Sequence, residues 1–495
     1  MDNLERVLYR MIIARLDGDR IDDPSCRAEL HDLVRKGIGG FIVFGGIYDE
    51  VSFFIEELQG ASSSPLFIAS DIERGVAQQI KGATEFPCQM AVAAAIRGDG
   101  ITDMELLRGS LKSVAGEAAD VGINMPLTPV LDVNRNPDNP IICTRAFSDN
   151  PDTVAWLGSE YIRAFESEGL LSCAKHFPGH GDTSVDSHMS LPVINKSYGE
   201  LLEEDIAPFR VAVERGVSGI MAGHLSIPSI DAMPASLSER LIRGVLREEL
   251  SFSGLVVTDA LDMHALKGIR NIHTLSLSAG ADLLLHPEDP EKAVSELLVS
   301  CRRGDLDEDT LKATLRRIGR FKEGLRLPKL VTEDLDTHRK SPRIIRERSI
   351  TLVRDDRSLI PVRALNAVPV LVSGDKPGEK AGMLRPYFSD VRPLEGAGRR
   401  SAGTVIIAVF TDVKAWRGSS GIGTDERRKI ERIIRNSESS VVISFGSPYL
   451  LRHFETADVL IAAYEPVESA VWSVVMGLGG EMEFRGALPV DIGLK

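Results

Sequence analysis

The chain has 495 residues, of which 43% are hydrophobic and 26% charged, and its formal net charge is −14. This composition is ordinary for a soluble globular enzyme, and the length allows about two or three domains. The negative charge argues against nonspecific binding to nucleic acid or to an anionic membrane, because both need a basic protein face.

The N-terminal segment 1–19 reads MDNLERVLYRMIIARLDGD, with no long apolar run and no small-residue cleavage site. We interpret it as an amphipathic helix rather than a signal peptide. No other run approaches about 18 consecutive apolar residues, so no membrane span is expected. The five cysteines show no CxxC spacing, a pattern typical of buried thiols in a reducing compartment. We therefore expect a cytoplasmic protein.

Short apolar runs alternate with segments of helical spacing through residues 1–325. This alternation predicts a parallel sheet and, at this length, a TIM-like (β/α)8 barrel. The apolar runs are 38–44, 66–69, 123–130, 170–174, 219–222, 255–258 and 281–285, and the helical segments include 151–168, 198–215 and 238–250, with Ser238 as an N-cap. Because this gives seven runs rather than eight, one strand is missing or irregular, and 90–95 is the candidate.

The stretch 326–343 is polar and without apolar periodicity, and a second alternation follows it. Its apolar runs are 368–372, 405–410, 441–445 and 459–463. Thr424, followed by two acidic residues, predicts the start of a helix there. We expect a smaller three-layer α/β sandwich domain. The predicted division is therefore a barrel at 1–325, a linker at 326–343 and an α/β domain at 344–495.

Most apolar runs of the first region end at a side chain that can bind a substrate or transfer a proton. Residues at the carboxyl ends of barrel strands converge on one mouth, where barrel enzymes keep their active sites. These side chains are Asp71, Glu73, Asp132, Lys175, His176, His224, Asp259 and His286.

The segment 170–192, LLSCAKHFPGHGDTSVDSHMSLP, is dense in titratable groups. A short buried strand is expected first, and then a loop, because glycine and proline prevent a regular element. In an extended loop, residues two apart point the same way, so Asp186 can accept a hydrogen bond from His188. The other imidazole nitrogen could then transfer protons near neutral pH. The alternative is a hydrogen bond that only stabilises the loop.

Asp259, in LVVTDALDM, follows a strand rich in β-branched residues. It could cap the next helical segment, since aspartate is a favoured N-cap. Convergence with Asp71, Arg145, Lys175 and His176 at the barrel mouth favours a role in a site instead.

A metal site is the competing interpretation of the same loop. Zinc could be held by His176, His180, Asp182 and His188. The spacing matches no HExxH motif or helical histidine pair, and Lys175 beside a cation would be unfavourable. We expect no metal and no other cofactor.

Several motifs match one known pattern: KHFPGHGDT (175–183), DSH (186–188), TDALDM (258–263), SDIERG (70–75), TEFPCQM (84–90), LDVNRNP (131–137), TRAFSDNP (144–151) and, near the C-terminus, GALPVDI (486–492). They resemble the family 3 glycoside hydrolases, specifically their β-N-acetylglucosaminidase branch. The resemblance extends over nearly the whole chain. It implies a barrel with an accessory α/β domain, a carbohydrate substrate and a retaining hydrolase that removes terminal β-linked N-acetylglucosamine.

Carried over by position, the resemblance makes Asp259 the nucleophile and His188 the general acid/base, oriented by Asp186. It gives the sugar-binding roles to Asp71, Arg145, Lys175 and His176. The substrates implied are muropeptides or chito-oligosaccharides.

Other functions remain open on the same residues. A β-glucosidase or xylosidase could use this scaffold, and the site could also belong to a sugar-binding protein without catalysis or to a metallohydrolase. A neutral imidazole does not repel an anion as a second carboxylate would, so phosphate could compete with water for the glycosyl-enzyme. A phosphorylase acting on N-acetylglucosaminides is therefore a further alternative.

Overall fold

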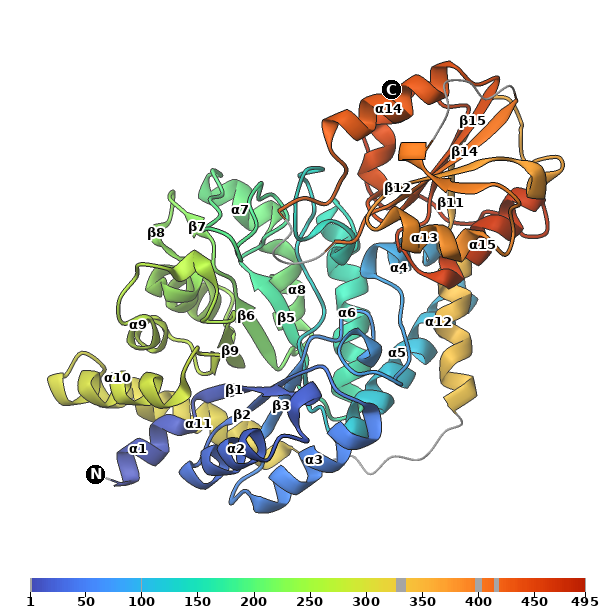
Figure 1. Cartoon of the computed structure of the whole chain (residues 1–495). Helices are drawn as coiled ribbons and strands as arrows, with labels where there is room; N and C mark the ends of the chain where they lie inside the picture. Colours follow the sequence, from blue (N-terminus) through green and yellow to red (C-terminus); the bar gives the residue numbers. More distant parts are fainter. Residues whose placement is uncertain (1, 99, 326–334, 397–402, 414–417, 495) are drawn as a thin grey trace. The chain divides into compact units, whose positions relative to one another are not determined.

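The computed structural model describes residues 2–98, 100–325, 335–396, 403–413 and 418–494 (Figure 1). They form two compact units: Met1–Phe86, Arg108–Val133 and Pro151–Arg339 in the first, and Pro87–Leu107, Asn134–Asn150 and Lys340–Lys495 in the second. The predicted boundary assigns 87–107 and 134–150 to the barrel. Part of the predicted linker, 326–334, lies outside the described residues, and the remainder begins helix α12 (Leu335–Ser349).

The first unit is a TIM-like α/β barrel, as predicted. Its parallel strands are β1 (Ile12–Asp17), β2 (Gly40–Phe44), β3 (Phe67–Ser70), β4 (Met125–Pro126), β5 (Cys173–Phe177), β6 (Gly219–Ala222), β9 (Leu255–Thr258) and β10 (Leu284–Leu285). They pair in the order β10-β1-β2-β3-β4 and β5-β6-β9, and Figure 1 labels β1, β2 and β3 of the first group and all of the second. Single parallel bridges from Val130 to Lys175 and from Val257 to Leu283 join the groups, so the ring closes.

The strand that the sequence analysis did not find is β1. Helix α1 (Asp2–Tyr9) ends before it, so the prediction of a helix over 1–19 was wrong for 12–17. The strand is buried except near Arg15, as expected for a parallel barrel strand covered on both faces. Residues 90–95 are not the missing strand, because they belong to helix α4 (Gln89–Ala95) of the second unit.

Helices follow the barrel strands in sequence: α2 (Pro24–Lys36), α3 (Tyr48–Ala61), α5 (Ile101–Val121), α6 (Pro151–Ser167), α7 (Tyr198–Glu204), α8 (Ala207–Glu214), η5 (Arg240–Glu249), α9 (Ile272–Ala279), α10 (Pro290–Arg303) and α11 (Glu308–Gly324). The predicted helical segment 198–215 is two helices, because Pro208 starts α8. The N-cap of η5 is Glu239 rather than the predicted Ser238, but the Ser238 hydroxyl accepts from the Leu241 amide at 3.2 Å in the first turn. A short hairpin, β7 (Ser226–Ile227) with β8 (Asp231–Pro234), follows β6. Within the described ranges, no helix has the length and apolarity to span a membrane.

The second unit is built on a mixed six-stranded sheet in the order β11-β16-β15-β14-β12-β13. The strands are β11 (Thr351–Asp355), β12 (Val370–Gly374), β13 (Val391–Pro393), β14 (Thr404–Phe410), β15 (Ser439–Phe445) and β16 (Val459–Ala462), and the main helices are α13 (Pro377–Leu384), α14 (Thr424–Arg435) and α15 (Glu468–Gly479). The sequence predicted the four central strands and α14. It did not predict the edge strands, of which β11 runs antiparallel to β16.

Alternate residues of this sheet enter two different cores, which gives the three layers. On β14, Ile407 packs in a core with Ile430 and Ile434 of α14. Its neighbour Ile406 packs in the opposite core with residues of α13 and α15, such as Val474. The first core also includes Met90 from α4, which explains why that segment belongs to the second unit.

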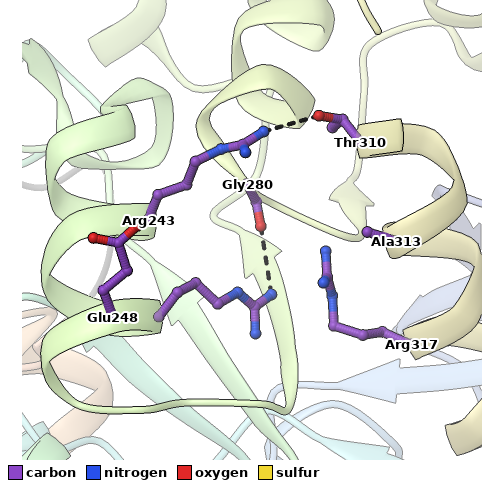
Figure 2. A pocket seen from close by; sticks show the side chains of 7 residues that line it. Arg243, Glu248, Gly280, Thr310, Ala313 and Arg317 are labelled. Atoms are coloured by element: carbon purple, nitrogen blue, oxygen red, sulfur yellow. Dashed lines mark hydrogen bonds between the residues drawn. The ribbon is translucent and has the colours of Figure 1, made fainter. Parts of the chain in front are cut away.

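At the amino ends of β9 and β10, one buried carboxylate holds two arginines. Asp282 is fully buried, and its two oxygens accept hydrogen bonds at 2.6 Å from Arg247 and at 2.7 Å from Arg317. Arg247 also donates to the Phe252 and Gly254 carbonyls just before β9. Beside this cluster is a pocket of about 230 Å³, and Figure 2 shows Arg243 and Arg317 at its edge. These bonds join η5, α11 and the two strand starts, so we assign the cluster to the stability of the barrel.

Replacing Arg247 with methionine should lower the free energy of unfolding by about 3 kcal/mol, because it removes one of the two charges that stabilise a buried carboxylate. The urea-denaturation midpoint of the intact chain measures the effect. The matched control is Arg316→Met, at an exposed position of α11 next to Arg317. Equal midpoints for the two variants would contradict the assignment.

Candidate active site

Asp259 lies immediately after β9, and its backbone amide donates to the Ala222 carbonyl at the end of β6. Its carboxylate accepts a hydrogen bond from the Ala260 amide at 2.8 Å. Burial opposes ionisation, but the imidazoles of His224, His176 and His188, with the Ala260 amide, lower the pKa of Asp259 to about 2. Asp259 is therefore a fixed negative charge at neutral pH.

His224, at the end of β6, fixes the backbone that carries this carboxylate. Its Nε2 lies 2.9 Å from the Ala260 carbonyl, and its Nδ1 lies 2.7 Å from the Ser236 hydroxyl. Because a carbonyl can only accept, Nε2 carries the proton and Nδ1 accepts from Ser236. Burial lowers the pKa of His224, so the ring is neutral at pH 7.

The pair Asp186–His188 forms as predicted, but through a tight turn rather than an extended loop. Oδ1 of Asp186 accepts from the His188 amide at 2.9 Å and from its Nδ1 at 3.0 Å. The Asp186 carbonyl accepts from the amides of Met189 and Ser190, which closes the turn. Since Nδ1 donates to a fully buried carboxylate, Nε2 of His188 can exchange a proton with a ligand.

Lys175 connects two carboxylates that follow β3. Its ammonium lies 2.6 Å from Oδ1 of Asp71 and 2.7 Å from Oε1 of Glu73. Lys175 and Glu73 are buried, whereas the Asp71 side chain is 27% exposed. Asp71 is thus the member of this group that a ligand can reach directly.

His176, the next residue, is fixed by Asp132, which follows β4 and the Val130 bridge in the chain. Nδ1 of His176 lies 2.7 Å from Oδ2 of Asp132, whose Oδ1 accepts from the amides of His176 and His180. Although burial alone would raise it, these histidines lower the pKa of Asp132. Burial lowers the pKa of His180 to about 4, so this ring is neutral at pH 7.

The first unit therefore brings together six of the seven predicted site residues: Asp71, Lys175, His176, Asp186, His188 and Asp259. The seventh, Arg145, belongs to the second unit, where its guanidinium donates to the Ile141 carbonyl at 3.2 Å.

Three further residues were absent from the predicted site although the structure gives each a place in it. They are Glu73, Asp132 and His224. All three follow predicted strands in the sequence, and that position is the signal that points to them.

The described part of the chain contains no group of three or more histidine, cysteine, aspartate or glutamate side chains arranged to hold a metal ion. The loop residues considered as zinc ligands have other partners. Nδ1 of His180 contacts the Thr183 hydroxyl at 2.8 Å, and Asp182 forms an ion pair with Lys196.

A closed (β/α)8 barrel whose strand ends present a carboxylate among imidazoles defines an enzyme site of the barrel type. The model of the glycosyl hydrolase family 3 N-terminal domain matches residues 13–321. The chain belongs to this family, and it is a glycoside hydrolase.

Relatives with names and structures are similar over most of the chain. A β-N-acetylglucosaminidase/β-glucosidase of Cellulomonas fimi is 28% identical, covering 92% of this chain and 88% of the relative. A family 3 β-N-acetylglucosaminidase from Paenibacillus sp. is 27% identical, with a TM-score of 0.82 and 99% of both chains covered. A β-glucoside phosphorylase, BglX, bound to 2FGlc is 25% identical, with a TM-score of 0.87 and coverage of 99% and 94%.

Proposed function

We propose that the protein is a retaining exo-β-N-acetylglucosaminidase acting on muropeptides or chito-oligosaccharides. The observation that carries this proposal is the ionised Asp259 carboxylate beside the imidazole of His188, which is itself paired with Asp186. A fixed carboxylate and a proton-exchanging group are the two parts that a retaining glycosidase needs.

In the first half-reaction, an oxygen of Asp259 forms a bond to C1 of the sugar as the bond from C1 to the leaving oxygen breaks. The protonated imidazole of His188 gives its Nε2 proton to that leaving oxygen. Asp186 stabilises the imidazolium before the transfer and keeps the remaining proton on Nδ1.

In the second half-reaction, water attacks C1 of the glycosyl-enzyme. Its proton passes to Nε2 of His188, the water oxygen forms a bond to C1, and the bond from C1 to Asp259 breaks. The sugar leaves with its original anomeric configuration, and both side chains return to their starting states.

Side chains at the carboxyl ends of β3 and β5 bind the sugar hydroxyls. Asp71 and His176 present an acceptor and a ring nitrogen, and their orientations are set by Lys175 and Asp132. Groups held in fixed orientations discriminate well, because a sugar that lacks the matching hydroxyl leaves one of their hydrogen bonds unmade.

The purified protein should hydrolyse 4-nitrophenyl β-N-acetylglucosaminide faster than the matching β-glucoside. The variant Asp259→Asn should lose at least about 10³-fold in kcat, because an amide cannot form the glycosyl-enzyme. Mass spectrometry with a fluorinated N-acetylglucosamine donor should find the label on Asp259. The control is Asp262→Asn, on the same loop, whose carboxylate pairs with His286 at 3.2 Å. A label on Asp262, or equal losses, would refute the role of Asp259.

Replacing His188 with alanine should lower kcat/KM for phenyl β-N-acetylglucosaminide by about 10²-fold or more, the range for lost general acid catalysis. The loss should be much smaller for the 2,4-dinitrophenyl glycoside, because its leaving group needs little protonation. Ser184→Ala, at an exposed position of the same loop, is the control. Equal losses on both substrates would show that His188 is not the acid.

A second candidate function is phosphorolysis. The similarity to a β-glucoside phosphorylase favours it, as does an imidazole in place of a second carboxylate near the glycosyl-enzyme. A phosphate oxygen would attack C1 in place of water, and the bond from C1 to Asp259 would break.

Product analysis in phosphate buffer tests this candidate. We expect N-acetylglucosamine 1-phosphate to form and to increase with phosphate concentration at the expense of free sugar. A reaction in a non-phosphate buffer of the same ionic strength is the control. If only free N-acetylglucosamine forms at every phosphate concentration, phosphorolysis is excluded.

A further inference from the structure

The loop that carries His188 leaves the barrel after β5 and returns at α7, and Lys196 lies just before that helix. Its ammonium lies 2.6 Å from Oδ2 of Asp205, 3.1 Å from Oε2 of Glu204 and 3.2 Å from Oδ2 of Asp182. Asp182 is on the outgoing part of the loop, whereas Asp205 and Glu204 are at the end of α7. One cation therefore joins both ends of the loop to the same helix end.

The outgoing part of the loop also packs directly against Asp205. A Cβ at Gly179 would lie 2.7 Å from the Cβ of Asp205, and the φ of Gly179 is +134°, so only glycine fits there. Asp132 also accepts a hydrogen bond from the His180 amide of the same part of the loop. The loop is thus fixed as far as Asp182.

The returning part is fixed by the hairpin that follows β6. The Ile194 amide donates to the Ser226 carbonyl, and the Ser226 amide donates to the Pro192 carbonyl, both at 2.9 Å. The Lys196 carbonyl accepts from the Ser229 hydroxyl at 2.6 Å. The segment 184–191, which contains Asp186 and His188, therefore lies between two anchored ends.

The charges at Lys196 make this anchor strong. The Lys196 side chain is 11% exposed and the Asp205 side chain is fully buried, so the pair is shielded from water. Burial raises the pKa of Asp205 to about 6 and Lys196 opposes the shift, so the carboxylate is ionised at pH 7. Three carboxylates around one ammonium would repel one another without it.

We propose that Lys196, through Asp182 and Asp205, is a positioning residue that sets where His188 presents its acid/base nitrogen to the substrate. The inference rests on the proposed function, because it assumes that His188 transfers the proton. Lys196 itself contacts neither the substrate nor Asp259 in this scheme.

The first test is Asp182→Ala, which removes the loop end of the anchor and leaves Lys196 paired with Asp205 and Glu204. Because a misplacement of about 1 Å can cost up to about 10²-fold in rate, kcat for phenyl β-N-acetylglucosaminide should fall by about 10-fold. KM for the phenyl glycoside should change little, and kcat/KM for the dinitrophenyl glycoside, which reports only the first half-reaction, should change by less than about twofold. Ser184→Ala is the control for loop substitution.

The second test is Lys196→Met, with Lys196→Arg as the conservative variant. Lys196→Met should show the same selective loss as Asp182→Ala, and arginine should restore most of the activity because it keeps the charge. Circular dichroism and thermal melting identify any variant that fails to fold, and Asp182→Ala then decides the question.

A double mutant separates the positioning role from the proposed function. In the His188→Ala background, Asp182→Ala should cause no further loss, because no acid remains to be positioned. Additive losses, or equal losses on both leaving groups, would overturn the positioning role while leaving His188 as the acid. If His188→Ala itself shows no dependence on the leaving group, the proposed function fails and the inference fails with it.

Discussion

The site depends on keeping one carboxylate charged where burial disfavours the charge. Asp259 remains ionised because imidazoles from three strand ends or loops surround it and because the next backbone amide donates to it. The barrel makes this possible, since it brings the carboxyl ends of β5, β6 and β9 side by side. The long loop after β5 then brings His188 close to the Asp259 carboxylate.

Each imidazole near Asp259 has its own partner, and the partners differ. His188 pairs with the buried carboxylate of Asp186, and His176 pairs with Asp132. His224 instead lies between the Ser236 hydroxyl and a backbone carbonyl, and burial lowers its pKa. Chemically similar side chains thereby acquire separate roles in one mouth.

The sequence predicted the barrel, seven of its strands and the contact between Asp186 and His188, because these depend on local periodicity and on residues close in the chain. It did not predict β1, since the apolar residues of 12–17 continue the amphipathic pattern of the preceding helix. It did not single out Asp132, because its partner His176 is distant in the chain and only the fold brings them together. The sequence also does not predict that Arg145 belongs to the second unit, because long-range packing decides it.

The core of the second unit contains residues from 87–107 and 134–150, which are synthesised long before residues 340–495 of the same unit. Met90 and Cys143 pack there with residues of β14 and β15, and the Cys88 amide donates to the buried carboxylate of Glu465. During synthesis, the apolar surface of these N-terminal residues therefore stays exposed until the C-terminal third of the protein has been made. A truncation at residue 325 would leave that surface exposed and prone to aggregation. The two units therefore cannot be separated by truncating the chain at one residue.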